Sequence, residues 1–187
     1  MIVSWLIALA AMLATLLAML YNRLIRDRNR VDAAWSDIDV QLQRRHDLIP
    51  QLVNAVDQYA SYERATIEAV TLLRSAAMQA SDVSERGQAE EELGSGVTRL
   101  LALAENYPDL KANANFLQLQ RELVETEDYL QFARRYYNGS VRVLNTRIQT
   151  IPSNIVANWF DFRERGYFQK AADEIAAVPL LDLGSVE

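Results

Sequence analysis

The 187-residue chain contains no cysteine and one histidine, His46. Without cysteine there can be no disulfide, no thiolate nucleophile and no thiolate metal ligand. One histidine is too few for a hydrolytic zinc site, and too few for the paired Glu-x-x-His motifs of a carboxylate-bridged di-metal bundle. We therefore predict a protein without a metal, without a cofactor and without enzymatic activity.

Glycine and lysine are also scarce. The six glycines are scattered singly, so the sequence contains no glycine-rich phosphate-binding loop. Lys111 and Lys170 are the only lysines, and all other cationic side chains belong to arginine. The net charge of −6 gives no reason to expect a nucleic acid as a partner.

Charge is missing altogether from the nineteen residues between Ile2 and Leu20. As a helix this run is about 28 Å long, close to the thickness of the hydrocarbon layer of a bilayer. A cleaved signal peptide is the main alternative, but the segment lacks a basic n-region and exceeds the usual apolar length. We predict that residues 1–21 form an uncleaved transmembrane anchor.

Two further features of the anchor region bear on topology and assembly. Four arginines follow the apolar run: Arg23, Arg26, Arg28 and Arg30. The positive-inside rule therefore predicts a single-pass protein of the bacterial inner membrane with its N-terminus outside and the rest of the chain in the cytoplasm. The same arginines can contact lipid headgroups. Small residues recur at steps of four and three, which either marks a membrane helix interface or reflects the abundance of alanine: Ser4, Ala8, Ala11, Thr15 and Ala18.

Apolar residues after the anchor keep a helical period, and no run alternates as a strand would. We predict an all-α fold, in which the transmembrane helix continues into an antiparallel, up-and-down bundle of three to four helices at residues 22–165. The first helix either continues unbroken or bends near Pro50 or Tyr59, and helical spacing runs on to about Ala80. We expect a loop at 81–92, a helix from 93 to 107, a long helix from near Asn113 to Pro152, a short helix from Ser153, and a tail at 166–187.

The segment RRHDLIP, residues 44–50, interrupts this regularity. Pro50 has no amide hydrogen, so the carbonyl oxygen of His46 loses its helical partner. Arg45 occupies an apolar position, so its guanidinium must reach water or meet a carboxylate, for which residues 122–128 are the obvious source. The acidic residues 90–92 are interpreted as a solvated helix start. We interpret the segment as a structural or partner-docking feature, rather than a pH sensor or a catalytic site: Arg44, Arg45, His46, Asp47 and Pro50.

Two blocks of the sequence resemble the LemA family. NRLIRDRNRVDAAWSDIDVQLQRRHDLIPQLVNAV is similar to the first long helix of that family, and FARRYYNGSVRVLNTRIQTIPSNIVANWFDF is similar to its second hallmark block. The resemblance covers almost the whole chain and implies a single-pass bacterial membrane protein with a cytoplasmic helical bundle. It implies no reaction. Some members resemble proteins of magnetosome membrane formation, and others are encoded near membrane metalloproteases.

Three classes of function follow from these observations. The preferred one is a non-enzymatic, membrane-anchored scaffold that forms a homo-oligomer or organises other membrane proteins. Apolar residues outside the helical seams favour assembly: Ala34, Val40, Leu48, Val53, Phe132, Tyr136 and Val143. An adaptor or regulator of a membrane protease or of an envelope-stress system rests on the resemblance alone. An enzyme is disfavoured by the inventory of residues.

Overall fold

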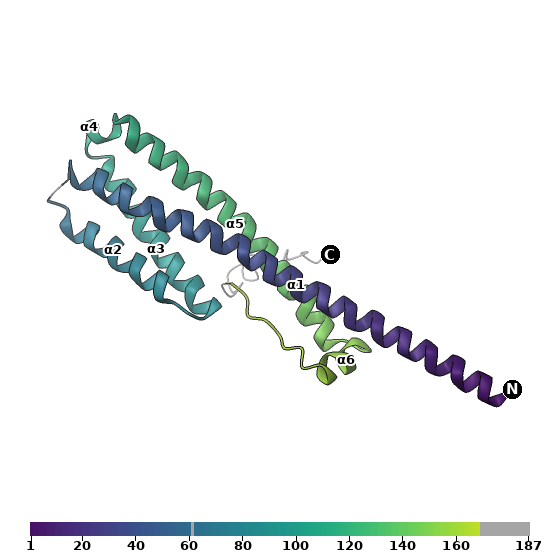
Figure 1. The fold of residues 1–187 in the computed structure, drawn as a ribbon. Helices are drawn as coiled ribbons and strands as arrows, with labels where there is room; N and C mark the ends of the chain where they lie inside the picture. Colours follow the sequence, from purple (N-terminus) through teal and green to yellow (C-terminus); the bar gives the residue numbers. More distant parts are fainter. Residues whose placement is uncertain (61, 169–187) are drawn as a thin grey trace, which may run out of the picture.

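The computed structural model describes residues 1–60 and 62–168, and within them the regular structure is entirely helical (Figure 1). The all-α class predicted from the sequence is confirmed. The predicted tail at 166–187 lies outside the described residues, apart from its first three. The helices are α1 (Ile2–Asp57), α2 (Arg64–Gln79), α3 (Val83–Ala104), α4 (Pro108–Lys111), α5 (Ala114–Gln149) and α6 (Ser153–Trp159).

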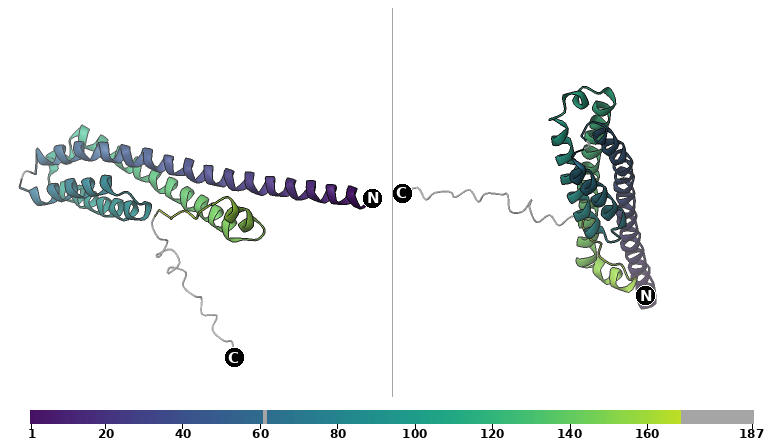
Figure 2. Two further views of the ribbon diagram at one scale, coloured as in Figure 1. Left: turned by 60° about the horizontal axis from the view of Figure 1, so that its bottom comes forward. Right: turned by 90° about the vertical axis from the view of Figure 1, so that its left-hand side faces the viewer.

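Helix α1 is one element of 56 residues, which corresponds to a length of about 84 Å. It passes through Pro50 without interruption and ends at Asp57, so the bend considered near Pro50 does not end the helix and the chain turns just before Tyr59. Residues 1–19 are all exposed, and this part of α1 projects beyond the bundle (Figures 1 and 2). Among the described residues, α1 is the one helix long and apolar enough to cross a membrane.

The rest of the chain folds back along α1. Helix α5 lies along α1, and α2 and α3 form an antiparallel hairpin that packs on the half of α1 farthest from the N-terminus (Figures 1 and 2). The short α4 connects α3 to α5, and α6 turns back against α1 near the point where the bundle begins. The four long helices therefore run up and down, as the sequence predicts.

Side-chain caps define where two of these helices begin. Asn113 accepts hydrogen bonds from the amides of Asn115 and Phe116 at 2.9 and 3.3 Å, which fixes the start of α5 where it was expected. Asp82 accepts from the amides of Ser84 and Glu85 at 2.9 and 3.4 Å. The loop predicted at 81–92 is therefore wrong, because the cap at Asp82 starts α3 at Val83.

The buried apolar side chains form two separate clusters. The first, called the proximal core, lies between α1, α5 and α6: Leu24, Val31, Ala34, Ile38, Leu42, Leu130, Ala133, Tyr137, Val141, Leu144, Ile148, Val156, Ala157 and Phe168. The second, called the distal core, lies between α1, α2, α3, α4 and the start of α5: Leu48, Ile49, Leu52, Val56, Ala60, Val70, Ala77, Leu93, Val97, Leu100, Ala104, Leu110, Phe116 and Leu123. On α1 the proximal core ends at Leu42 and the distal core begins at Leu48.

Candidate functional site

A charged layer fills the gap between the two cores. It consists of Arg45 and His46 from α1, Glu90 from α3 and Glu127 from α5. On α5 the same boundary falls between Leu123 and Leu130, which belong to the distal and proximal cores respectively. The charged layer is therefore where the apolar interior of the bundle is divided.

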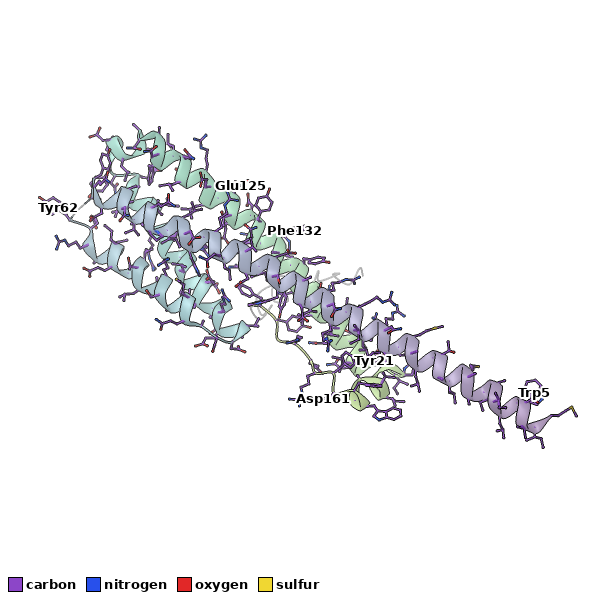
Figure 3. The ribbon with its side chains drawn as sticks, viewed as in Figure 1. Trp5, Tyr21, Tyr62, Glu125, Phe132 and Asp161 are labelled. Carbon is purple, nitrogen blue, oxygen red and sulfur yellow. The ribbon has the colours of Figure 1, made fainter. Side chains whose placement is uncertain are left out.

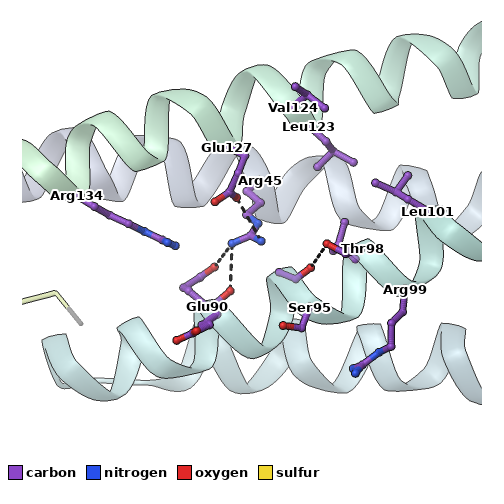
Figure 4. Close-up of a pocket in the computed structure, with 13 residues that line it drawn as sticks. Arg45, Glu90, Ser95, Thr98, Arg99, Leu101, Leu123, Val124, Glu127 and Arg134 are labelled. Carbon is purple, nitrogen blue, oxygen red and sulfur yellow. Dashed lines mark hydrogen bonds and ion pairs between the residues drawn. The ribbon is translucent and has the colours of Figure 1, made fainter. Parts of the chain in front are cut away.

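Glu90 is the centre of the charged layer. One carboxylate oxygen lies 3.1 Å from Nη1 of Arg45, and the other lies 2.7 Å from Nε2 of His46. The distance between Nε2 of His46 and the carboxylate oxygen is that of a hydrogen bond. The Nη1 atom of Arg45 also donates to the backbone carbonyl of Glu90 at 3.2 Å, and Nη2 lies 3.5 Å from Glu127 (Figure 4).

The expectation that the acidic residues 90–92 form a solvated helix start is correct in part: Glu91 and Glu92 are exposed, but Glu90 is buried and the helix already begins at Val83. The Glu90 side chain is 0% exposed, and not solvated as predicted. Arg45 meets Glu127, which belongs to the acidic stretch expected to face it, but it also meets Glu90, which lies outside that stretch. The capping pattern Asp82-x-x-Glu85 was a signal that α3 starts near residue 82, which places residue 90 within a helix; it does not indicate which side of that helix is buried.

The carbonyl oxygen that Pro50 leaves without a helical partner is satisfied from another helix. Nε of Arg74 on α2 donates to the carbonyl oxygen of His46 at 2.8 Å. A guanidinium thus replaces the missing amide of residue 50, and it ties the hairpin of α2 and α3 to α1. His46 therefore makes two contacts with other helices: its carbonyl oxygen accepts from Arg74 of α2, and its side chain contacts Glu90 of α3.

A pocket of about 590 Å³ opens beside the charged layer, between α3 and α5 (Figure 4). Arg45 lies at its base next to Gly94, where an added Cβ would come within 2.7 Å of Nη2. Arg134 reaches into the same space from α5, and its Cζ lies 5.0 Å from the ring centre of Phe168. Burial lowers the pKa of Arg134, and the charge of nearby Glu127 opposes this effect. The lack of a side chain at Gly94 leaves room for the guanidinium of Arg45, which joins α1 to α3 and α5.

The chemistry of this arrangement is that of a structural ion pair. His46 is 2% exposed and Arg45 is 5% exposed, and each directs its polar atoms to a carboxylate of another helix. Breaking such a pair leaves an uncompensated buried charge, so the layer disfavours any sliding of α3 or α5 along α1. These two side chains therefore offer very little surface to a partner.

Two other residues of the segment, Arg44 and Asp47, lie on the outside, whereas Leu48 and Ile49 belong to the distal core and Pro50 is partly buried. Arg44 pairs with Glu125 of α5 at 3.3 Å, and both side chains are about half exposed. Asp47 is exposed and accepts a hydrogen bond from Gln43 at 2.9 Å. Partner docking through this segment is therefore open only to its exposed members, Arg44 and Asp47.

The predicted membrane residues all lie on exposed parts of α1. The stripe of small residues faces outward from the projecting part of the helix, and the Thr15 hydroxyl donates to the carbonyl oxygen of Ala11 at 2.8 Å. The four arginines after the anchor are exposed as well: Arg23, Arg26, Arg28 and Arg30. Cζ of Arg28 lies 5.7 Å from the ring centre of Phe162. The structure brings neither group into the charged layer.

Taken with its apolar N-terminal run, this architecture defines a class of protein: a membrane-associated helical bundle built on the same helix as its candidate membrane span. The chain belongs to the LemA family, whose model matches residues 34–182. Protein LemA of Metamycoplasma hominis is 30% identical over 161 residues, which cover 84% of this chain and 71% of that protein. The resemblance seen in the two sequence blocks is thereby confirmed.

Magnetosome proteins are also similar to this chain. Magnetosome protein MamQ 2 of Paramagnetospirillum magneticum is 26% identical over 190 residues, which cover 88% of this chain and 70% of that protein. Magnetosome protein MamQ of Magnetospirillum gryphiswaldense is 24% identical over 190 residues, with the same shares covered. The similarity extends over most of the bundle in each case.

Proposed function

We propose that this protein is a non-enzymatic scaffold, anchored in the bacterial inner membrane with its N-terminus outside and its bundle in the cytoplasm, which assembles with copies of itself. The apolar N-terminal part of α1, which is long enough to cross a membrane, supports a role at a membrane. The observation that carries the proposal is an exposed apolar face on the pair of α1 and α5. The charged layer serves the scaffold by holding the helices that present this face in register.

The exposed face, called the α1–α5 face, centres on four large side chains. Val40 is 63% exposed and Phe132 is 64% exposed, and they line a shallow pocket with Tyr129 and Tyr136. In Figure 3, Phe132 and Glu125 both stand on the outer edge of α5. Apolar patches of this kind on a folded domain mark surfaces that bind other proteins.

The continuous α1 supports a second copy as the occupant of this face. Copies anchored in one membrane stand parallel, and their anchors hold them at the same height. A two-fold axis along the membrane normal then sets α1 of one copy against α5 of the other. Arg44 of one copy would face Glu125 of the other, because these two residues already lie at the same level in one chain. In such a dimer, the positive Arg44 of each copy would lie opposite the negative Glu125 of the other copy.

The experiment is a mass measurement of the full-length protein in nanodiscs or mild detergent. We expect an oligomer for the natural chain, and mostly monomer after the double change Val40→Asp and Phe132→Asp, because charge at the centre of an apolar interface blocks its burial. The matched control is Tyr62→Asp, which changes a 96% exposed side chain at the far end of the bundle. A monomeric natural protein would refute self-assembly, and an oligomer that survives the double change would refute this face.

The anchor and the orientation have tests of their own. Replacing Ala8, Ala11 and Ala18 together with leucine keeps the span apolar but prevents close approach of helices, so we expect weaker assembly if the stripe is part of the interface. A reporter that is active only in the periplasm, fused after Glu187, should stay inactive. A strong signal from it would place the bundle outside.

A further inference from the structure

We propose that α6 and the residues on either side of it form a second membrane contact, which lies in the boundary between lipid headgroups and hydrocarbon beside the anchor. This contact is independent of self-assembly. It would make the bundle rest on the bilayer at its base, in addition to being tethered by α1.

The first observation is an exposed apolar ridge along α6. Ile155 and Trp159 lie four residues apart on α6 and are 61% and 74% exposed, and Ile151 just before the helix and Phe160 just after it are 81% and 54% exposed. The opposite side of the same helix is buried against the proximal core through Ser153, Val156 and Ala157. The helix therefore already has its protein contact, and the ridge faces away from it. So many large apolar side chains on one short segment are unusual on a surface that meets only water.

The second observation is the position of this ridge along α1. The ring centre of Phe160 lies 4.7 Å from that of Tyr21, and Phe162 lies 5.9 Å from the same ring. Leu20 and Tyr21 pack against the cluster that includes Val156. Leu20 is the last residue of the apolar run, so α6 sits at the level where the hydrocarbon layer ends (Figures 1 and 3).

The third observation is the charge around the ridge. Arg23 and Arg26 are exposed on α1 at the same level, and Arg163 is 82% exposed after α6. Asp161 is the acidic partner of Arg163 at 3.2 Å. Tryptophan and other aromatic side chains gather at membrane interfaces because their rings prefer the headgroup level, and arginine there attracts anionic lipid. The ridge and the neighbouring arginines have the composition that is typical of a protein surface at a membrane interface.

A lipid surface fits the ridge better than another protein does. The anchor brings the ridge to the bilayer in every copy of the chain, whether or not a second copy is present. A protein partner would have to displace lipid headgroups from the base of the bundle in order to reach the ridge. The apolar side chains, the basic rim and the height along α1 all agree on the lipid interface.

The test uses the absence of cysteine from the natural chain, which makes any introduced cysteine unique. Ile155→Cys carries a nitroxide label in the full-length protein, reconstituted in vesicles of phosphatidylcholine and phosphatidylglycerol. Collisions of the label with oxygen, which concentrates in lipid, are compared with collisions with a water-soluble nickel chelate. The matched control is the same label on Tyr62→Cys, far from the membrane and 96% exposed.

We expect the label at position 155 to collide readily with oxygen and several-fold less with nickel than the label at position 62, because polar solutes are excluded from hydrocarbon. Adding Trp159→Asn should raise the nickel collisions at position 155, while circular dichroism confirms an unchanged helix content. Nickel collisions equal to those at position 62 would show a ridge in water and overturn the proposal. Protection from both reagents would show that protein covers the ridge, and would overturn it as well.

Discussion

Replacing Arg74 with methionine removes the guanidinium that satisfies the carbonyl oxygen of His46, while it keeps most of the aliphatic stem. A hydrogen bond from a charged group contributes about 1.5–3 kcal/mol, and an unsatisfied buried acceptor costs a similar amount. We therefore expect the free energy of unfolding to fall by about 2 kcal/mol. The measurement is urea denaturation of a fragment spanning residues 22–187, followed by circular dichroism.

The explanation by Pro50 is tested by repeating the change in a Pro50→Ala background. The alanine introduced at position 50 has an amide that can bond to the same carbonyl oxygen, so loss of Arg74 should cost about 1 kcal/mol less there. Pro50→Ala alone should stabilise by clearly less than the roughly 3 kcal/mol typical of removing a proline from a helix interior, because the acceptor is already occupied.

Arg64→Met on the same helix is the matched control, because Arg64 is exposed and should change stability by at most about 0.5 kcal/mol. Equal costs of Arg74→Met in the two backgrounds would refute the reasoning, since Arg74 would then be doing something other than replacing the amide.

Three further predictions concern the charged layer and the two cores. Glu90→Gln should lower the free energy of unfolding by about 3 kcal/mol, because Arg45 loses its buried counter-charge; a loss below about 0.5 kcal/mol in urea denaturation would contradict the proposed role of Glu90. Gly94→Ala should destabilise, because the new Cβ would lie 2.7 Å from Nη2 of Arg45, whereas Gly139→Ala, with no atom within 4 Å, should stabilise by about 1 kcal/mol in the same assay. Burial raises the pKa of Tyr137, so the unfolded chain ionises first and stability should fall as the pH rises above about 10; Tyr137→Phe should flatten that fall, and an unchanged pH profile would count against the burial effect.

Much of the fold could be predicted because its signals are local. The start of α5 at Asn113 and of α6 at Ser153 depend on residues within one turn of each helix. Asn138-Gly139 resembles a turn signal but lies within α5, because apolar residues at helical spacing continue on both sides of it, and the burial of Arg45 follows from its place between Leu42 and Ile49. These features required no knowledge of which helix packs on which.

The features that could not be predicted from the sequence depend on contacts between distant segments of the chain. Glu90 becomes a buried residue only because α3 turns that side toward Arg45 and His46, which lie 45 and 44 residues earlier in the chain. The bond from Arg74 to the carbonyl oxygen of His46 joins residues 28 apart, and no periodicity within either helix indicates it. The level of α6 beside Tyr21 follows from the antiparallel return of α5, so the ridge on α6 could not be placed before the bundle was known.

With residues 1–21 in the membrane as proposed, the continuity of α1 would make the molecule a lever that turns at the bilayer surface. From Tyr21 to Asp57 the helix extends for about 54 Å, with no hinge to absorb a rotation. A tilt of the membrane span by about 10° would therefore displace the far end of the bundle by about 9 Å, close to the diameter of a helix. Changes in bilayer thickness that alter the tilt of the span would thus be magnified at the distal core. The α6 ridge lies close to the fulcrum, so its contact with lipid would act on a short arm and would oppose that displacement only weakly.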